Sequence, residues 1–333
     1  MTFHKSCNMD EPRVLAMLPD VINGKTQAEL LKELRESSSQ QNCYELEGMK
    51  FSWVMPRSAF EGIKTFEVRD DDVFVPAYPK SGSHWLHEIV KYIQSEGNDN
   101  FDRSFMNTAM EVVSMKSPEK DKTNVPGYKI METWESPRCM ATHCHARFLP
   151  TKVCGSKAKV VYLARNPKDT FVSFFNFMKE FLLPSFRNWD AFFFSLFTGT
   201  TLGGSWFDHV LGFWERRNDE NVLYMKYESM HKDLRGSICK IAKHLDKDLS
   251  DDVIDYITKK TTFHGMKNTY QQLEQGMGEE AKMRTKHIGR APFLLKGKVG
   301  GWKNYFTVAQ SDAFDMVYNE KLQGTGLDFD FEL

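Results

Sequence analysis

The feature that most constrains the fold of this chain is a series of short apolar runs, each followed by a turn or a helical pattern. The runs span residues 73–77, 138–143, 159–164 and 221–227. The third, KVVYLA, is apolar on both faces, as expected for a strand inside a parallel sheet. Strands that alternate with helices predict an α/β fold with a central, mostly parallel sheet flanked by helices. Ligands of such sheets bind beyond the carboxyl ends of the strands.

The segment after the third run carries the clearest helix signal. Asn166 and Pro167 match the N-cap and the first residue of a helix. Apolar residues then recur at helical spacing, namely Phe171, Phe174, Phe175, Met178 and Phe181. We therefore expect a helix that packs this stripe against the protein core, with Phe177 off the stripe.

The first 44 residues are predicted to be an extension that precedes the main domain. Within it, Thr26 and Glu29 have the spacing of a capping box ahead of the helical segment LLKELRE. From residue 45 to residue 333 no linker, repeat or low-complexity segment interrupts the chain. We expect one domain over 45–333, preceded by an extension (1–44) with a short helix.

Composition argues against several classes of partner. The chain has 44 basic and 45 acidic residues, so it has no global charge to attract nucleic acid or an anionic membrane. No apolar run reaches the roughly 18 residues that a membrane span needs, and Asp10 and Glu11 stand where a signal peptide would be apolar. Six cysteines without framework spacing indicate free thiols. We expect a cytoplasmic protein that binds neither nucleic acid nor membrane.

The stretch YPKSGSHWL, residues 78–86, follows the first apolar run and centres on a Lys-Ser-Gly turn. A strand, this turn and a helix that begins near His84 would aim several backbone N–H groups and the positive end of the helix at an anion. The turn is not a Walker A motif, because there the lysine follows a glycine, whereas here Lys80 precedes Gly82. Taken alone, it fits a phosphate site or an ordinary connection between strand and helix.

The same stretch resembles the YPKSGTTWL signature of the cytosolic sulfotransferases, which bind the sulfuryl donor 3′-phosphoadenosine 5′-phosphosulfate (PAPS). The resemblance covers roughly residue 50 to the C-terminus and continues in the family's order. It runs through SPRCMATH (136–143), VVYLARNPKDTFVSFFNF (160–177), GSWFDHV (204–210), VLYMKYESM (222–230), TTFHGMK (261–267) and KGKVGGWKNYFTVAQSD (296–312). It implies a PAPS-dependent sulfotransferase with a P-loop-like phosphosulfate turn.

The resemblance also implies which residues hold the donor. Lys80 would bind the 5′-phosphosulfate together with the turn residues Ser81, Gly82, Ser83 and His84. The adenine would lie between Trp85 and Phe263, near Tyr227, Thr261, Thr262 and Met266. The 3′-phosphate would be bound by Arg165, Ser173, Lys296 and Gly297.

Two of the matched residues imply the chemistry. His143 matches the catalytic base, and a histidine at the end of a buried strand can take a proton from the acceptor near neutral pH. Lys80 would stabilise the charge that develops on the leaving oxygen. Phe177 matches a position that lines the acceptor pocket, so we expect a small hydrophobic acceptor with a hydroxyl group, such as a phenol, a steroid or another alcohol.

The segment Lys303–Asp312 resembles the short KxxxTVxxxE segment through which family members form dimers, with Asp312 where glutamate is usual. So short a segment buries too little area for an obligate interface. We therefore expect a weak homodimer in which Asp312 pairs with a lysine across a two-fold axis.

A zinc site is a second way to interpret the residues around His143. Cys139, Cys144 and His145 lie close to it in the sequence. Alternation along a strand, however, puts His143 and His145 on one face and Cys144 on the other, so these residues cannot close one tetrahedral site without a bend. We expect no metal.

Four departures from the family fall inside the implied site. Ala141 replaces a lysine, His84 a threonine, Leu295 an arginine and Gly301 an aspartate. They leave open a second class of function, a sulfotransferase-fold protein that binds nucleotide or hydrophobic small molecules but transfers little. A nucleotide kinase is a third class, but it would require a complete Walker A motif. Activity is favoured because the other matched groups remain, namely Lys80, His143, Arg165 and Ser173.

The departure at position 295 can be tested by restoring the arginine. Arginine grips a phosphate through two parallel charge-assisted hydrogen bonds, and leucine offers neither. Each such hydrogen bond is worth about 1.5–3 kcal/mol. The affinity for the 3′-phosphate should therefore be lower by about 10- to 100-fold unless a neighbour such as Lys296 compensates. Leu295→Arg should tighten binding of 3′,5′-bisphosphorylated adenosine but not of its analogue without the 3′-phosphate. Calorimetry with both ligands measures the difference, and an equal gain for both would contradict the expected contact.

Overall fold

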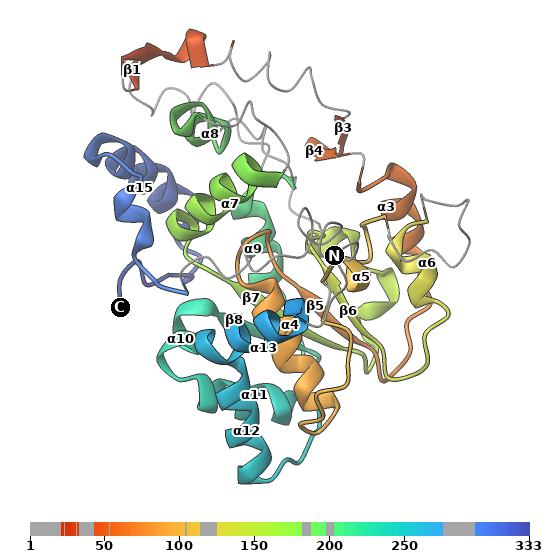
Figure 1. The fold of residues 1–333 in the computed structure, drawn as a ribbon. Helices are drawn as coiled ribbons and strands as arrows, with labels where there is room; N and C mark the ends of the chain where they lie inside the picture. Colours follow the sequence, from red (N-terminus) through yellow and green to blue (C-terminus); the bar gives the residue numbers. More distant parts are fainter. Residues whose placement is uncertain are drawn as a thin grey trace.

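The computed structural model describes residues 21–22, 24–30, 32, 43–52, 54–103, 105–113, 125–181, 188–197, 203–275 and 297–333. A four-stranded sheet forms its centre, in the order β6-β5-β7-β8, and every pair of neighbours is parallel (Figure 1). The strands are β5 (Val73–Pro76), β6 (Cys139–Thr142), β7 (Lys159–Ala164) and β8 (Val222–Lys226). Each lies within one of the predicted runs, so the predicted α/β fold with a parallel sheet is confirmed.

The two faces of the sheet bury two separate hydrophobic clusters. Phe74 and Tyr162 belong to one cluster, whereas their neighbours Val75 and Val161 belong to the other, because successive side chains of a strand point to opposite faces. The second cluster is covered by α4 (Ser83–Gln94), α11 (Leu234–His244) and α12 (Asp251–Thr261). The first is covered by α3 (Arg57–Lys64), α7 (Pro167–Phe181), α8 (Trp189–Ser195), α9 (Trp206–Trp214) and α15 (Val308–Leu322).

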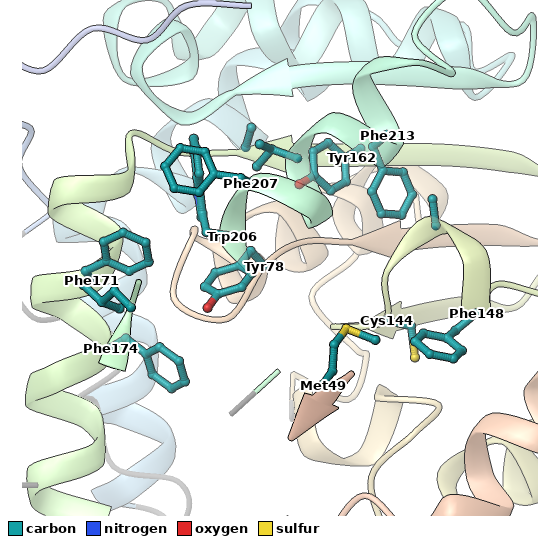
Figure 2. Close-up of a cluster of buried hydrophobic side chains, with 14 of the residues drawn as sticks. Met49, Tyr78, Cys144, Phe148, Tyr162, Phe171, Phe174, Trp206, Phe207 and Phe213 are labelled. Atoms are coloured by element: carbon teal, nitrogen blue, oxygen red, sulfur yellow. The ribbon is translucent and has the colours of Figure 1, made fainter. Parts of the chain in front are cut away.

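The first cluster is rich in aromatic rings, several of which are seen in Figure 2. Tyr162 of β7 stacks on Phe213 of α9 with 4.2 Å between ring centroids, and Tyr78 meets Phe174 of α7 edge-on at 6.2 Å. The predicted stripe of α7 is buried at Phe171, Phe174, Phe175 and Met178. Burial of each such side chain contributes about 1.5–3 kcal/mol, so α7 is held firmly against the core.

Two antiparallel hairpins were not predicted from the sequence. One joins β1 (Val21–Ile22) to β2 (Lys25–Thr26), and the other joins β3 (Cys43–Leu46) to β4 (Met49–Ser52). The predicted capping box is present, since the Glu29 N–H donates to Thr26 Oγ1 at 3.3 Å and the Thr26 N–H to Glu29 Oε2 at 2.8 Å. Most of the helix expected after it lies outside the described residues.

The remaining elements connect these layers. They are α5 (Phe105–Thr108), α6 (Gly127–Met131), α10 (Tyr227–Lys232), α13 (Phe263–Gln275) and the short 3₁₀ segments η1 (Ala146–Phe148), η2 (Thr151–Val153) and η5 (Gly301–Asn304). Over the ranges that the structure describes, no helix is both long and apolar enough to cross a membrane.

Candidate active site

The predicted site residues come together because they follow neighbouring strands. Lys80 comes after β5, His143 directly after β6, and Arg165 directly after β7. Parallel strands end at the same edge of the sheet, so these side chains share one edge. Arg165 Nη1 lies 3.4 Å from the Lys80 carbonyl oxygen, and His143 Nδ1 lies 2.7 Å from the carbonyl oxygen of Ala77.

The turn after β5 requires its glycine. Gly82 has a φ of 100°, in the left-handed region, and a Cβ added there would lie 2.9 Å from Cδ2 of Tyr227. Lys80 also has a positive φ, 69°, which is uncommon for a residue with a side chain and is typical of functional sites. Helix α4 begins at Ser83, close to the predicted start. The start of this helix therefore faces the edge of the sheet where the candidate residues meet.

Two buried donors at this edge have no hydrogen-bond partner among the described residues. They are the Ser81 hydroxyl, on a residue with no exposed surface, and Nε of Arg165. A buried donor without a partner costs about 1–3 kcal/mol, so a site that leaves two of them is suited to a ligand with acceptor oxygens. The group that the sequence implies here is the phosphosulfate and 3′-phosphate of PAPS, and these donors fit it.

The residues predicted to surround an adenine also lie together. Trp85 Nε1 donates to the Thr261 carbonyl at 2.7 Å, and the Trp85 ring meets that of Tyr227 edge-on at 5.1 Å. A Cβ added to Gly297 would lie 2.5 Å from Cδ2 of Phe263, so that ring packs against the glycine backbone. Phe263 is 39% exposed although it is a large apolar residue, which leaves ring surface for a flat ligand.

Two other residues predicted to lie near the adenine, Met266 and Thr262, have different surroundings. Met266 is buried, whereas the Thr262 hydroxyl accepts the Gly265 N–H at 3.0 Å. The Thr262 side chain therefore caps the start of α13 in this structure.

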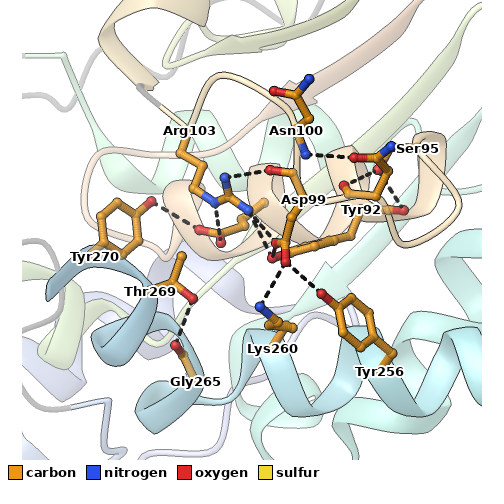
Figure 3. Close-up of polar contacts among 12 residues, drawn as sticks. Tyr92, Ser95, Asp99, Asn100, Arg103, Tyr256, Lys260, Gly265, Thr269 and Tyr270 are labelled. Carbon is orange, nitrogen blue, oxygen red and sulfur yellow. Dashed lines mark hydrogen bonds and ion pairs between the residues drawn. The ribbon is translucent and has the colours of Figure 1, made fainter. Parts of the chain in front are cut away.

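A polar network ties together the helices that carry these residues, as Figure 3 shows. Arg103 contacts Asp99 at 2.7 Å and Glu88 of α4 at 3.2 Å. Lys260 of α12 reaches Asp99 at 2.8 Å, and the Tyr270 hydroxyl of α13 donates to Glu88 at 3.0 Å. The network therefore fixes α4, α12 and α13 relative to one another.

The contact of His143 with Ala77 defines its tautomer. A carbonyl oxygen can only accept, so Nδ1 carries the proton, and Nε2 of the neutral ring carries the lone pair. Burial lowers the pKa of His143, the Glu111 carboxylate and the Ala77 carbonyl oppose that shift, and the Lys80 charge adds to it. The ring is therefore neutral at neutral pH, the form that a general base requires.

Glu111 was not predicted from the sequence. It has no exposed surface, accepts the backbone N–H of His143 at 2.8 Å through Oε1, and accepts the Thr142 hydroxyl at 2.7 Å through Oε2. Its segment runs beside β6, because Ala109 forms a parallel bridge with Ala141. No motif marks this glutamate, and the only signal in the sequence is a carboxylate within an otherwise apolar stretch, AMEVV.

On α7, Ser173 and Phe177 are four residues apart and therefore share a face of the helix. Lys80 Nζ lies 4.6 Å from the centre of the Phe177 ring, which places that face at the turn. Both side chains are half-buried.

Three of the four residues that depart from the family pattern lie in the described part of the chain, and their surroundings differ. Ala141 is fully buried against Ala109 and Val112. His84 is largely buried at the start of α4, where burial and the Lys80 charge hold its pKa well below the usual value. Gly301 lies beside Asp169, which accepts the N–H groups on either side of it. Leu295 lies outside the described residues, as does the predicted site residue Lys296.

His145 makes a different contact from His143. Its Nε2 lies 2.9 Å from the Gly203 carbonyl, and burial lowers its pKa to about 4. Cys139 and Cys144 are buried free thiols. Within the described part of the chain, no group of three or more His, Cys, Asp or Glu side chains is arranged to hold a metal ion.

A parallel sheet whose carboxyl edge carries a left-handed turn, a helix start and a buried histidine is typical of group-transfer enzymes that bind nucleotides. Comparison with known proteins identifies the family, since the sulfotransferase domain matches residues 70–326. The chain therefore belongs to the cytosolic sulfotransferase family and is a PAPS-dependent sulfotransferase.

Individual relatives agree over most of the chain. Amine sulfotransferase of Oryctolagus cuniculus is 37% identical over 278 residues, which are 82% of this chain and 88% of the relative. Sulfotransferase 4A1 of Homo sapiens is 36% identical and covers 83% of this chain and 89% of its own. A solved structure of mouse sulfotransferase SULT7A1 complexed with PAP, the desulfated donor, has 31% identity and a TM-score of 0.68 and covers 85% of this chain and 95% of its own.

The carboxylate beneath His143 gives a prediction about pH dependence. Glu111 raises the pKa of His143, so Glu111→Gln should lower that pKa. Because the neutral ring is the active form, the acidic limb of the kcat/KM profile should move to lower pH. The rate on the plateau should fall about 10-fold, since a weaker base transfers the proton less readily.

Thr142→Val provides the control for Glu111→Gln. It removes a hydrogen bond to Glu111 but keeps the charge. We expect its acidic limb to stay in place, as measured by steady-state rates across pH. If the acidic limb of the kcat/KM profile is unchanged in Glu111→Gln, or moves to higher pH, then Glu111 does not act on His143 through its charge.

Proposed function

We propose that this enzyme transfers the sulfuryl group of PAPS to a hydroxyl of a small hydrophobic acceptor, with His143 as the general base. The observation that carries the proposal is the 2.7 Å contact between His143 Nδ1 and the Ala77 carbonyl, which leaves the lone pair on Nε2. Nε2 would take the proton as the acceptor oxygen attacks, and the negative charge of Glu111, which raises the pKa of His143, would stabilise the imidazolium that forms.

Lys80 would act at the opposite end of the reaction. Sulfuryl transfer resembles phosphoryl transfer, in which attack is in line and charge builds on the bridging oxygen of the leaving group. A preorganised ammonium at the turn stabilises that charge without reorganising in the transition state. The contact of Lys80 Nζ with the Phe177 ring supports this position, because it holds the ammonium on the α7 side of the turn.

The phosphosulfate, the 3′-phosphate and the adenine of the donor would be bound by different groups of residues around the turn. The Ser81 hydroxyl would bind the 5′-phosphosulfate, and Arg165 with Ser173 would bind the 3′-phosphate. The unpartnered Ser81 Oγ and Arg165 Nε support this assignment. The adenine would lie between Trp85 and Phe263, and the exposed ring surface of Phe263 supports that position.

An apolar acceptor is favoured by the ring at Phe177 and the aromatic cluster behind it. Phe177 packs against the first hydrophobic cluster, which also contains Phe174 and Tyr78. Such a surface binds flat or apolar molecules through buried area, while a few polar groups orient them. Because one relative is named an amine sulfotransferase, an amine is the second acceptor class that the assay includes.

Three further proposals concern the whole protein. We propose that residues 45–333 form the sulfotransferase domain after an extension over 1–44, and that the protein is cytoplasmic. We also propose a weak homodimer through Lys303–Asp312. The resemblance of that segment to KxxxTVxxxE supports the dimer, and Val308 in its middle is 80% exposed and so open to a partner.

Incubation of the protein with labelled PAPS tests the proposed function. Phenols, steroids, aliphatic alcohols and an amine serve as acceptors, and sulfated product is separated and counted. We expect product with at least one hydroxyl-bearing acceptor. Binding of PAP without product from any acceptor would instead support the alternative, a sulfotransferase-fold protein that binds ligands but transfers little.

Replacement of the proposed base separates chemistry from binding. His143→Ala should lower turnover by at least about 10²-fold, because proton transfer to a positioned base is lost. Its affinity for PAP should be nearly unchanged, as calorimetry would show. Turnover comparable to that of the unmodified enzyme would mean that another residue removes the proton.

Lys80→Ala should damage the rate more than the affinity for PAP. The ammonium is needed most when charge develops on the leaving oxygen, so it acts chiefly in the transition state. Single-turnover rates and PAP dissociation constants of the variant measure the two effects. Equal losses in both would reduce Lys80 to an anchor for the ground state.

A further inference from the structure

The turn over Gly297–Trp302, here called the donor turn, joins several residues of the proposed donor site. Arg165 Nη2 donates to the Lys298 carbonyl at 3.2 Å, and Gly297 packs on the Phe263 ring. His231 Nε2 of α10 lies 2.9 Å from the Gly297 carbonyl oxygen. The donor turn therefore contacts Arg165 through Lys298 and the ring proposed to hold the adenine through Gly297, whose end of the turn is held by His231.

The donor turn is supported from inside by one carboxylate. Asp169 of α7 accepts the Gly300 N–H and the Trp302 N–H, both at 2.9 Å. The same carboxylate lies 3.9 Å from Arg165 Nη2. Asp169 thus fixes the end of the turn that includes Gly300 and Trp302.

Residues 327–332, here called the strap, contact the donor turn through Phe331 and Glu332. Its sequence, LDFDFE, alternates apolar and acidic residues, as an extended segment with one buried face does. Leu327 and Phe329 are buried, and the Phe331 ring lies 5.3 Å from that of Tyr318. The apolar face of the strap therefore anchors it to the core.

The acidic residues of the strap pair with lysines on three different elements. Asp330 contacts Lys232 of α10 at 3.0 Å, and Glu332 contacts Lys303 beside the donor turn at 2.6 Å. Asp328 pairs with Lys226 at the end of β8. Both partners of the first two pairs are about half exposed, and exposed ion pairs contribute little, so the buried rings and the backbone contacts must hold the strap.

The strap meets the donor turn at Trp302. Trp302 Nε1 donates to the Phe331 carbonyl at 3.0 Å. A Cβ added to Gly300 would be 3.5 Å from that same carbonyl oxygen, so the two backbones are in contact. The amine of Lys168 lies 4.3 Å from the Trp302 ring and 5.3 Å from the Phe331 ring, which joins the two rings through one buried cation.

We propose that the strap holds the donor turn in the position that binds the 3′-phosphate of the nucleotide, and that Trp302 and Phe331 are positioning residues for this reaction. The inference rests on the proposed donor site. Removing the contact frees the turn at Trp302, so the Lys298 carbonyl no longer holds Arg165 in place, whereas the contact with His231 keeps Gly297 beside the Phe263 ring. Affinity is then lost for ligands that carry the 3′-phosphate and kept for those that lack it.

Trp302→Phe tests the strap, because it removes the indole N–H but keeps an aromatic ring beside Lys168. Calorimetry measures its dissociation constants for PAP and for adenosine 5′-monophosphate, which has no 3′-phosphate. The constant for PAP should rise about 3- to 10-fold, as expected for one lost hydrogen bond. The dissociation constant for adenosine 5′-monophosphate should change less than about 2-fold.

Trp214→Phe is the matched control. Trp214 Nε1 donates to the Thr325 carbonyl at 2.9 Å, so the substitution removes the same kind of bond from the same terminal segment, outside the strap and the donor turn. We expect it to lower the melting temperature as Trp302→Phe does but to leave PAP binding unchanged. Equal effects of the two variants on PAP, or equal losses for both ligands in Trp302→Phe, would overturn the inference. If the unmodified enzyme does not prefer PAP, the proposed donor site is wrong and the inference falls with it.

Discussion

The parallel pairing of β5 between β6 and β7 is the constraint on which the site depends. Lys80, His143 and Arg165 follow these three strands, and only a parallel arrangement brings all three chain exits to one edge. The contact of His143 with Ala77 is itself a contact between the ends of neighbouring strands. A shift in their register would change the tautomer of the proposed base as well as its position.

The sequence was most informative where a pattern is local. The run KVVYLA is long and apolar on both faces, so it could be placed inside the sheet, and the stripe from Phe171 to Met178 predicted α7 and its buried face. The turn at Lys80–Gly82 was predicted from its place between an apolar run and a helical segment, and the structure has it between β5 and α4. Each of these features is decided by residues that are close together in the chain.

Several features that depend on contacts between distant segments were not predicted. The part played by Glu111 follows from the bridge between Ala109 and Ala141, which no spacing in the sequence reveals. The hairpin strands have two or four residues each, too few to establish a period. The resemblance placed Thr262 in the nucleotide site, but it could not show that its hydroxyl caps α13.

The contact of Arg165 with both Lys80 and Lys298 has a consequence for folding. It joins a turn after the first strand of the sheet to a turn near the C-terminus, and contacts of such sequence separation form only after large loops have closed. The complete donor site therefore exists only when the whole domain has folded. A nucleotide that binds only this state stabilises the sheet and both hydrophobic clusters together, so bound donor protects the entire domain against unfolding.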